Sequence, residues 1–303
     1  GKISNEKIDD LCHTLKEFAQ IMESYKVTAY KAYGTSAIRE TENTLILQDQ
    51  IEQRTGIRVE TLSNSEQRFL DYKSIASKGE TFRRIIEEKT AILDIGGGSI
   101  QISLFDKDTL VSTQNLRLGV LRLQELLNHL NAGSTQMERL VDELATAQLD
   151  DYKKLYLKDR EIKNIIIVDD YLSPWAVRKA HERGEVNAVV DRKAFSQLME
   201  ALRTKGTTEL AKRMDIAEEK VPLVYISAIL TRRIAELMGA ELVWAPGVTL
   251  CDGIAYEYAE QNKMFRGEHD FAEDIIACAL NISKRYNGSS KRADTLEHIT
   301  TTI

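Results

Sequence analysis

The spacing of apolar residues predicts a first region in which helices and strands alternate. The first helix follows the N-capping residue Ser4 and carries apolar residues at helical spacing: Ile8, Leu11, Leu15, Phe18 and Met22. Strands are predicted over 27–33 and 57–62, with a helix over about 43–53 between them and another helix after the polar run 63–66. This alternation is typical of α/β proteins with mainly parallel strands.

The pattern restarts at Ala91 with three strands in succession, which we expect to form a meander over 91–96, 101–106 and about 110–118. The elements predicted next are, in order, a helix through Leu130, a loop at Asn131–Ser134, a long helix over 135–159, a core strand at Ile165–Val168, a helix from Ser173-Pro174, two further helices, a helix over 226–238, a strand over 242–244 and a helix over 253–262 that starts at Thr249 or Asp252. After Gly267 only helices are predicted, the first over 271–285. We therefore expect two α/β domains, 1–88 and 89–264, followed by the start of a helical region, 265–303.

One stretch combines a strand end, a glycine turn and side chains suited to phosphate chemistry. Residues 94–99 read Asp-Ile-Gly-Gly-Gly-Ser between two predicted strands. Glycines let backbone N–H groups approach an oxyanion because no Cβ intervenes, and a carboxylate such as Asp94 can hold hydrated Mg²⁺ against phosphate oxygens. A hairpin whose glycines only permit a tight turn is the alternative. A dinucleotide-binding fingerprint and a Walker loop are excluded because their Gly and Lys spacings are absent.

Composition narrows the class of protein. The length of 303 residues favours two domains, and the net charge of −6 argues against a general nucleic-acid or membrane-surface binder. Three scattered cysteines give neither a disulfide framework nor zinc-ligand spacing, which indicates a reducing cytoplasm. No apolar run reaches the roughly 18 residues of a membrane-spanning helix. Because the chain opens and closes abruptly, we expect it to be a fragment.

Two further side chains are candidates for phosphate chemistry, and each has a structural alternative. Arg39 follows a predicted strand end and can clamp a phosphate beside free helix N–H groups, or pair on the surface with Glu40 or Glu42. Glu66 lies in the first turn of a predicted helix, where it can act as a general base for water or complete a helix cap.

Three more positions carry the same ambiguity. Arg122 can contact an anion or face solvent, and the pair Asp169-Asp170 can bind a metal or cap the helix that follows. The five histidines show no clustering and are interpreted as structural or surface residues.

The order of these motifs resembles that of the exopolyphosphatase / guanosine pentaphosphate phosphohydrolase family. The motifs that carry the resemblance are Gly34-Thr-Ser-Ala-Ile-Arg-Glu40, Ser65-Glu66-Gln67-Arg68, Asp94-Ile-Gly-Gly-Gly-Ser99, Leu118-Gly-Val-Leu-Arg122 and Ala245-Pro-Gly-Val-Thr-Leu-Cys-Asp-Gly253. The similarity covers nearly the whole chain, and its end, 272–287, is similar to the linker into the helical HD-type domain of the long members.

The resemblance implies an actin-like fold with two ribonuclease-H-like domains and an active-site cleft between them. It implies Glu66 as the water-activating base, Asp94 as the Mg²⁺-associated carboxylate, and a set of phosphate contacts: Arg39, Gly96, Gly97, Gly98 and Ser99. The implied reaction is hydrolysis of the terminal phosphate of inorganic polyphosphate, with guanosine pentaphosphate as a related substrate. A homodimer is an expectation from the resemblance alone.

Three departures from the family pattern keep other functions open. The family's first Asp-x-Gly-Ser loop has no counterpart, which we attribute to a chain that begins after it. Gln101 stands where relatives carry Glu, and 169–174 replaces a glycine-rich turn. A sensor that binds polyphosphate or a guanosine alarmone without hydrolysis is therefore the main alternative. A sugar or acetate kinase on the same fold is less consistent with the altered turn.

A basic segment near the chain end suits a polyanionic substrate. It supplies four cations within nine residues: Lys284, Arg285, Lys291 and Arg292. We expect these residues to guide a long polyphosphate chain, whereas a solvated helix–loop–helix junction is the alternative.

Overall fold

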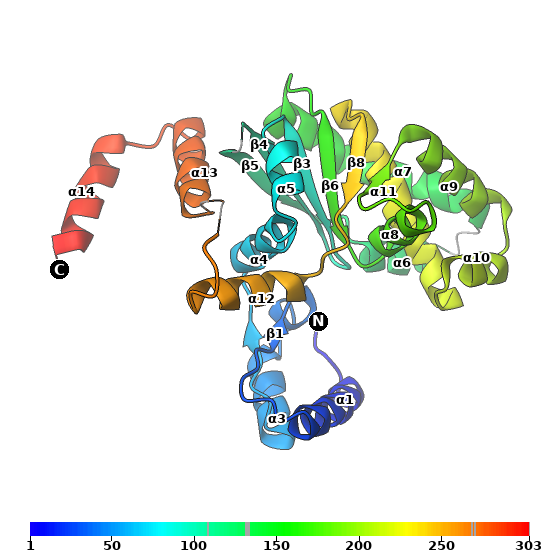
Figure 1. Cartoon of the computed structure of the whole chain (residues 1–303), viewed down its shortest axis with the longest axis horizontal. Helices are drawn as coiled ribbons and strands as arrows, with labels where there is room; N and C mark the ends of the chain where they lie inside the picture. Colours follow the sequence, from blue (N-terminus) through cyan, green and yellow to red (C-terminus); the bar gives the residue numbers. More distant parts are fainter. Residues whose placement is uncertain (108, 131–133, 268, 270, 303) are drawn as a thin grey trace. The chain divides into compact units, whose positions relative to one another are not determined.

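The computed structural model describes residues 1–107, 109–130, 134–267, 269 and 271–302. The chain divides into two compact units, Gly1–Leu70 and Asp71–Ile303, whose elements are drawn in Figure 1. The predicted domain boundary at residue 88 falls inside the second unit, and the division into three domains stays a prediction. None of the described helices is both long and apolar enough to cross a membrane.

The first unit is built around two packed helices. It contains α1 (Asn5–Ser24), β1 (Tyr33–Gly34), α2 (Ser36–Arg39), α3 (Thr44–Thr55), β2 (Glu60–Thr61) and the first half of α4 (Asn64–Ala76). Ser4 caps α1 as predicted, since its side chain accepts a hydrogen bond from the backbone N–H of Lys7. The helices α1 and α3 bury a small apolar cluster: Ile8, Cys12, Leu47 and Ile51.

The two strands of this unit are shorter than the sequence predicts. β1 and β2 pair in parallel over two residues each, whereas strands over 27–33 and 57–62 were expected. Val27 and Tyr30 are close to half exposed, so the apolar residues of the first segment do not pack into the core. An isolated pair of strands gains little from extension, because each strand has only one neighbour.

A six-stranded sheet forms the centre of the second unit, with the order β5-β4-β3-β6-β8-β7. Its strands are β3 (Thr90–Ile95), β4 (Ile100–Asp106), β5 (Thr109–Leu116), β6 (Asn164–Asp169), β7 (Ala188–Val190) and β8 (Leu242–Ala245). The predicted meander is confirmed, since β3, β4 and β5 pair antiparallel, while β6 runs parallel to β3 and β8. The three-residue β7, antiparallel to β8, was not predicted because so short a segment shows no periodicity.

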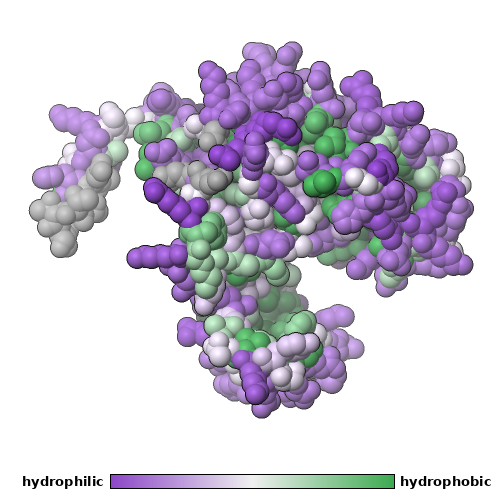
Figure 2. Space-filling model, in the orientation of Figure 1, coloured by the Kyte–Doolittle hydropathy of each residue, from purple (hydrophilic) through white to green (hydrophobic). Residues whose placement is uncertain are grey.

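Helices cover both faces of this sheet (Figure 1), which explains the continuous apolar sequences of β3 and β6. Ala91, Leu93 and Ile95 join the main core on one face, and Ile92 is buried on the other. The helices are α5 (Glu80–Ile86), α6 (Val120–His129), α7 (Ser134–Tyr152), α8 (Leu172–Glu182), α9 (Arg192–Thr204), α10 (Thr207–Met214), α11 (Val221–Met238) and α12 (Leu250–Gln261). Hydrophilic side chains cover most of α9 and α10 in Figure 2.

Two helix predictions need correction. The helix expected over 135–159 is α-helical only to Tyr152 and continues as a π-helical turn, Lys153–Leu157. The helix expected over 226–238 begins five residues earlier, at Val221. For α12 the structure selects Thr249, one of the two residues predicted to start it, as the N-cap, in a capping box with Asp252. The loop predicted at Asn131–Ser134 lies, apart from Ser134, outside the described residues. The short α5 was not predicted.

The first helix of the C-terminal region lies along an edge of the sheet. The region consists of α13 (Phe271–Arg285), at the predicted bounds, and α14 (Ser290–Thr302). The buried Asp274 accepts a hydrogen bond from the backbone N–H of Leu110 in the edge strand β5 at 3.1 Å. At the other end of α13, Arg285 donates to the carbonyl of Leu155 at 2.7 Å and lies 4.1 Å from the centre of the Tyr156 ring. The helix therefore protects strand groups that an exposed edge would present to other chains.

Candidate active site

Asp94 lies at the carboxyl end of β3, among other polar groups of the second unit. The pairing of β3 with β4 sets it opposite Gln101, whose side-chain amide donates to the Asp94 carboxylate at 3.1 Å. Burial raises the pKa of Asp94 to about 6; hydrogen bonds with Asp71 and Gln101 oppose this rise, and the charges of Asp170 and Asp169 add to it. A carboxylate whose pKa is raised in this way is stabilised in its ionised form by any cation that binds beside it.

The glycine loop after β3 is held by the start of α6. The first backbone N–H groups of α6 donate to loop carbonyls: Val120 to Gly96 at 3.0 Å, and both Leu121 and Arg122 to Gly97, at 2.9 and 3.1 Å. This contact depends on Gly119, because a Cβ there would lie 2.1 Å from the carbonyl carbon of Gly98. The loop and the helix are therefore in direct backbone contact.

The backbone N–H groups of the loop, in contrast to its carbonyls, are available to bind a ligand. The backbone N–H of Gly96 donates to the carbonyl of Ser99 at 3.0 Å, which closes the turn. The N–H groups of Gly97, Gly98 and Ser99 donate to no acceptor in the parts of the chain that the structure describes. Three successive free N–H groups form a concavity suited to an anion such as phosphate.

The side chain of Arg122 also holds this loop in place. Its Nε donates to the carbonyl of Gly98 at 3.0 Å, and the residue is exposed. The sequence analysis did not anticipate this hydrogen bond to the loop. The role of Arg122 as an anion contact stays a prediction.

Arg39 is fixed within the first unit, at the end of α2. Its guanidinium donates to the carbonyl of Leu62 at 2.7 Å and lies 3.5 Å from the side-chain oxygen of Gln67. The alternative pairing with Glu40 or Glu42 is not the observed one. The side chain is thus oriented by the segment that leads into α4, and phosphate contact stays a prediction.

Glu66 forms a capping box at the start of α4. Its carboxylate accepts from the backbone N–H of Ser63 at 2.8 Å, and its own N–H donates to the Ser63 hydroxyl at 3.2 Å. The hydrogen bonds from Ser63 lower the pKa of Glu66, so the group is ionised at neutral pH. The capping interpretation is therefore confirmed, whereas the role as a base stays a prediction.

Asp169 caps α8, as its structural alternative proposed. Its carboxylate accepts from the backbone N–H groups of Leu172 and Ser173, at 2.8 and 2.6 Å, and from the Ser227 hydroxyl at 2.6 Å. Among the described residues, no three His, Cys, Asp or Glu side chains are grouped to hold a metal ion. The hydrogen bonds from Leu172 and Ser173 show that the Asp169 carboxylate serves as the cap of α8.

Asp71 is the polar residue of this site that sequence reasoning missed. It is buried and forms a side-chain hydrogen bond with Asp94. The available signal was a carboxylate on the apolar side of a helix, between Leu70 and Tyr72, which are both buried.

The basic segment near the chain end is not uniform. Arg285 is engaged with Leu155 and Tyr156, as described above. Lys284, Lys291 and Arg292 are exposed. Any contact with a remote polyanion therefore falls to these three residues.

Comparison with known proteins adds to this geometry. The model of the Ppx/GppA phosphatase family matches residues 1–262. Exopolyphosphatase 1 of Mycobacterium bovis is 32% identical over 104 residues, which are 34% of this chain and 29% of that protein. Exopolyphosphatase 1 of Mycobacterium leprae is 34% identical over 104 residues, with the same shares of the two chains. The chain thus aligns with less than a third of the length of these curated relatives.

Solved structures match over a larger share of the chain. An exopolyphosphatase from Cytophaga hutchinsonii superposes with a TM-score of 0.70 at 19% identity, covering 86% of this chain and 84% of that one. The Aquifex aeolicus member of the Ppx/GppA family gives 0.67 at 15% identity, with the same coverage. At these identities the likeness concerns the fold, and it confirms the predicted class, an actin-like α/β fold with a helical C-terminal region.

Proposed function

Because the chain belongs to the Ppx/GppA phosphatase family, we propose that it is a cytoplasmic phosphoanhydride hydrolase that removes the terminal phosphate of inorganic polyphosphate, with guanosine pentaphosphate as a second substrate. The observation that carries this proposal is the row of free N–H groups at Gly97, Gly98 and Ser99, in the loop that follows the strand end at Asp94. These groups supply the fixed dipoles that a phosphoryl group needs.

The mechanism that fits these residues is direct attack of water on the terminal phosphorus. Transfer of a phosphoryl group depends mainly on positioning and charge neutralisation. Glu66, ionised at neutral pH, accepts the proton of the attacking water, and the bond between the terminal phosphorus and the bridging oxygen breaks. The loop N–H groups and Arg39 bind the phosphate oxygens. We propose no phosphoenzyme, since no Ser-His-Asp or Cys-His arrangement is visible in the sequence.

The residues around Asp94 fit a Mg²⁺ ion. Magnesium is commonly held by one or two carboxylates together with substrate phosphates, so a cage of three protein ligands is not required. The raised pKa of Asp94 and the neighbouring charges of Asp169 and Asp170 show excess negative charge at this point. Asp94 would hold the ion, which, when bound, neutralises charge on the phosphate oxygens.

Phosphate release from long-chain polyphosphate in the presence of Mg²⁺ tests the proposal. The second candidate, a sensor that binds without hydrolysis, is favoured by one observation: Gln101, in place of a glutamate, donates its amide to Asp94. Tight binding of polyphosphate without release would select the sensor. Guanosine pentaphosphate is assayed in parallel, and titration with ATP tests a kinase.

Asp94→Asn is expected to stabilise the free protein at neutral pH. The pKa of Asp94 is raised from 3.8 to about 6 on folding, so the ionised form lowers stability above pH 6, and this penalty disappears below about pH 4, where both states are protonated. We expect a gain of about 1–3 kcal/mol at pH 7 that vanishes toward pH 4. Urea unfolding at several pH values measures it.

The same variant is expected to lose Mg²⁺ dependence and substrate binding together. Asp151→Asn, an exposed position on α7, is the matched control for the loss of one charge. Two results would contradict the raised pKa of Asp94: a variant that is no more stable than the parent at pH 7, or one that is stabilised as much at pH 4 as at pH 7.

The combined change of Lys284, Lys291 and Arg292 to Gln is expected to raise the KM for long polyphosphate and to flatten its salt dependence. Contacts between exposed charges are screened over about 10 Å at 0.1 M salt, so a guiding role is strongly salt-dependent. Very short substrates are expected to be unaffected. Arg192, Lys193 and Lys212, exposed on α9 and α10, provide a control with the same loss of charge. Equal losses on long and short chains would reject a guiding role.

A further inference from the structure

We propose that a pocket in the second unit, lined by none of the residues of the candidate active site, binds a nucleoside phosphate. The pocket has a volume of about 460 Å³ and lies between α8, β7, α9 and α10. This volume is within the range of small-molecule sites. Two features specify its ligand: an aromatic floor and a set of cations without acids.

The floor of the pocket is apolar and contains an accessible indole. Trp175 is partly buried, and five fully apolar, buried residues accompany it in the lining: Ala176, Val190, Leu198, Leu210 and Met214. The indole N–H donates to no acceptor in the parts of the chain that the structure describes. A planar ring of a ligand can stack on this indole, as bases stack on aromatic side chains in other proteins.

The charges that line the pocket have one sign. Lys179, Arg183 and Arg213 are among the lining residues, whereas no Asp or Glu is. Their acidic partners, Glu182, Glu185 and Glu209, lie outside the lining. A pocket lining that contains three cations and no acid is unexpected in a chain of net charge −6, and it suits an anionic ligand. The three ion pairs are at the surface, where such pairs stabilise little, so a phosphate can replace them readily.

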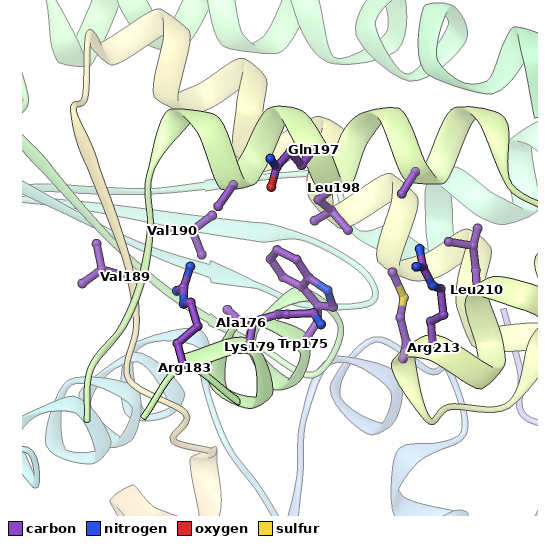
Figure 3. A pocket seen from close by; sticks show the side chains of 13 residues that line it. Trp175, Ala176, Lys179, Arg183, Val189, Val190, Gln197, Leu198, Leu210 and Arg213 are labelled. Atoms are coloured by element: carbon purple, nitrogen blue, oxygen red, sulfur yellow. The ribbon is translucent and has the colours of Figure 1, made fainter. Parts of the chain in front are cut away.

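The two features are close enough to act on one molecule. In Figure 3 the side chains of Arg183 and Arg213 flank the Trp175 indole, and Leu198 and Gln197 of α9 lie across from it. A base stacked on Trp175 would carry its phosphates to one of these guanidinium groups, which bind phosphate oxygens in bidentate fashion. Neither an uncharged nucleoside nor pyrophosphate alone uses both features, so both should bind more weakly than a nucleoside diphosphate.

Intrinsic fluorescence tests this proposal, because the chain has two tryptophans and the other, Trp244, is only 1% exposed. The protein is titrated with ADP, adenosine and pyrophosphate, without polyphosphate, so the result does not depend on hydrolysis. We expect saturable quenching by ADP, and affinities for adenosine and pyrophosphate that are lower by about 10-fold or more.

Variants then assign the binding to this pocket. Arg183→Gln and Arg213→Gln are each expected to raise the Kd for ADP about 10-fold, whereas Lys212→Gln, next to Arg213 but not lining the pocket, is not. Asp94→Asn is expected to keep ADP binding, because Asp94 does not line this pocket, and loss of ADP binding in this variant would contradict the proposal. Circular dichroism verifies that each variant is folded. Absence of saturable quenching, or quenching that survives both arginine changes, would overturn the proposal, and so would equal affinity for pyrophosphate.

Discussion

Glu66→Gln is expected to lower the turnover of polyphosphate about 10²–10⁴-fold, the usual contribution of a general base, while binding of the substrate is largely kept. Glutamine has the shape of glutamate but cannot accept a proton from water at neutral pH. The loss should therefore appear in kcat and not in KM. Steady-state phosphate release over a range of polyphosphate concentrations separates the two constants.

The capping box allows this substitution to change the chemistry of residue 66 without removing the helix cap. Gln serves at the third helical position of such a box as well as Glu does, so α4 should keep its N-terminus in Glu66→Gln. Ser63→Ala is the matched control, because it removes the hydroxyl that accepts from the Glu66 N–H and leaves the carboxylate in place. If Ser63→Ala lowers kcat as much as Glu66→Gln does, the contribution of Glu66 is structural. Near-full turnover in Glu66→Gln would also remove it from the role of base.

Gly119→Ala is expected to destabilise the second unit by about 3 kcal/mol or more and to abolish binding of phosphate by the loop. The added Cβ would lie 2.1 Å from the carbonyl carbon of Gly98 and 2.2 Å from the carbonyl oxygen of Gly97. Both atoms belong to the backbone, so no side chain can move aside, and α6 must separate from the loop. Urea unfolding and titration with polyphosphate measure the two effects.

Gly206 supplies the control for this substitution. Both glycines precede a helix with nearly the same backbone angles, φ −70° and ψ 148° at Gly119 and φ −69° and ψ 151° at Gly206. A Cβ at Gly206 would meet nothing within 4 Å. Gly206→Ala therefore reports only the small cost of Ala at a helix cap, and the difference between the variants is the cost of the close contact. Equal losses in both variants would contradict the steric explanation.

The elements that sequence reasoning predicted well are those with a strong periodic pattern of their own. The bounds of α13, 271–285, and the meander of β3, β4 and β5 follow from apolar spacing, and the glycine loop is visible as a local motif. The β7 strand was missed because three residues carry no period. The helix after Lys153 changes to π-helical geometry without a signal in the spacing.

The parts of the site that were missed depend on contacts between distant segments. The importance of Gly119 comes from its contact with Gly97 and Gly98, about twenty residues earlier in the chain, and sequence alone gave no reason to pair them. Asp71 was overlooked for the same reason, since its hydrogen bond with Asp94 joins a helix to a strand end. Apolar spacing tells which face of an element is buried, but it does not tell what that face touches.

The contact between the loop and α6 also has an electrical consequence. Each free N–H of the loop belongs to a peptide group whose own carbonyl accepts a hydrogen bond from α6: the carbonyl of Gly96 shares a peptide with the N–H of Gly97, that of Gly97 with Gly98, and that of Gly98 with Ser99. Donation to a carbonyl polarises the peptide and strengthens its N–H as a donor. The partial positive charge at the start of α6 is thus relayed through three peptide groups, the last of them polarised by the Arg122 guanidinium. An anion in the loop is therefore attracted by a helix that it does not touch.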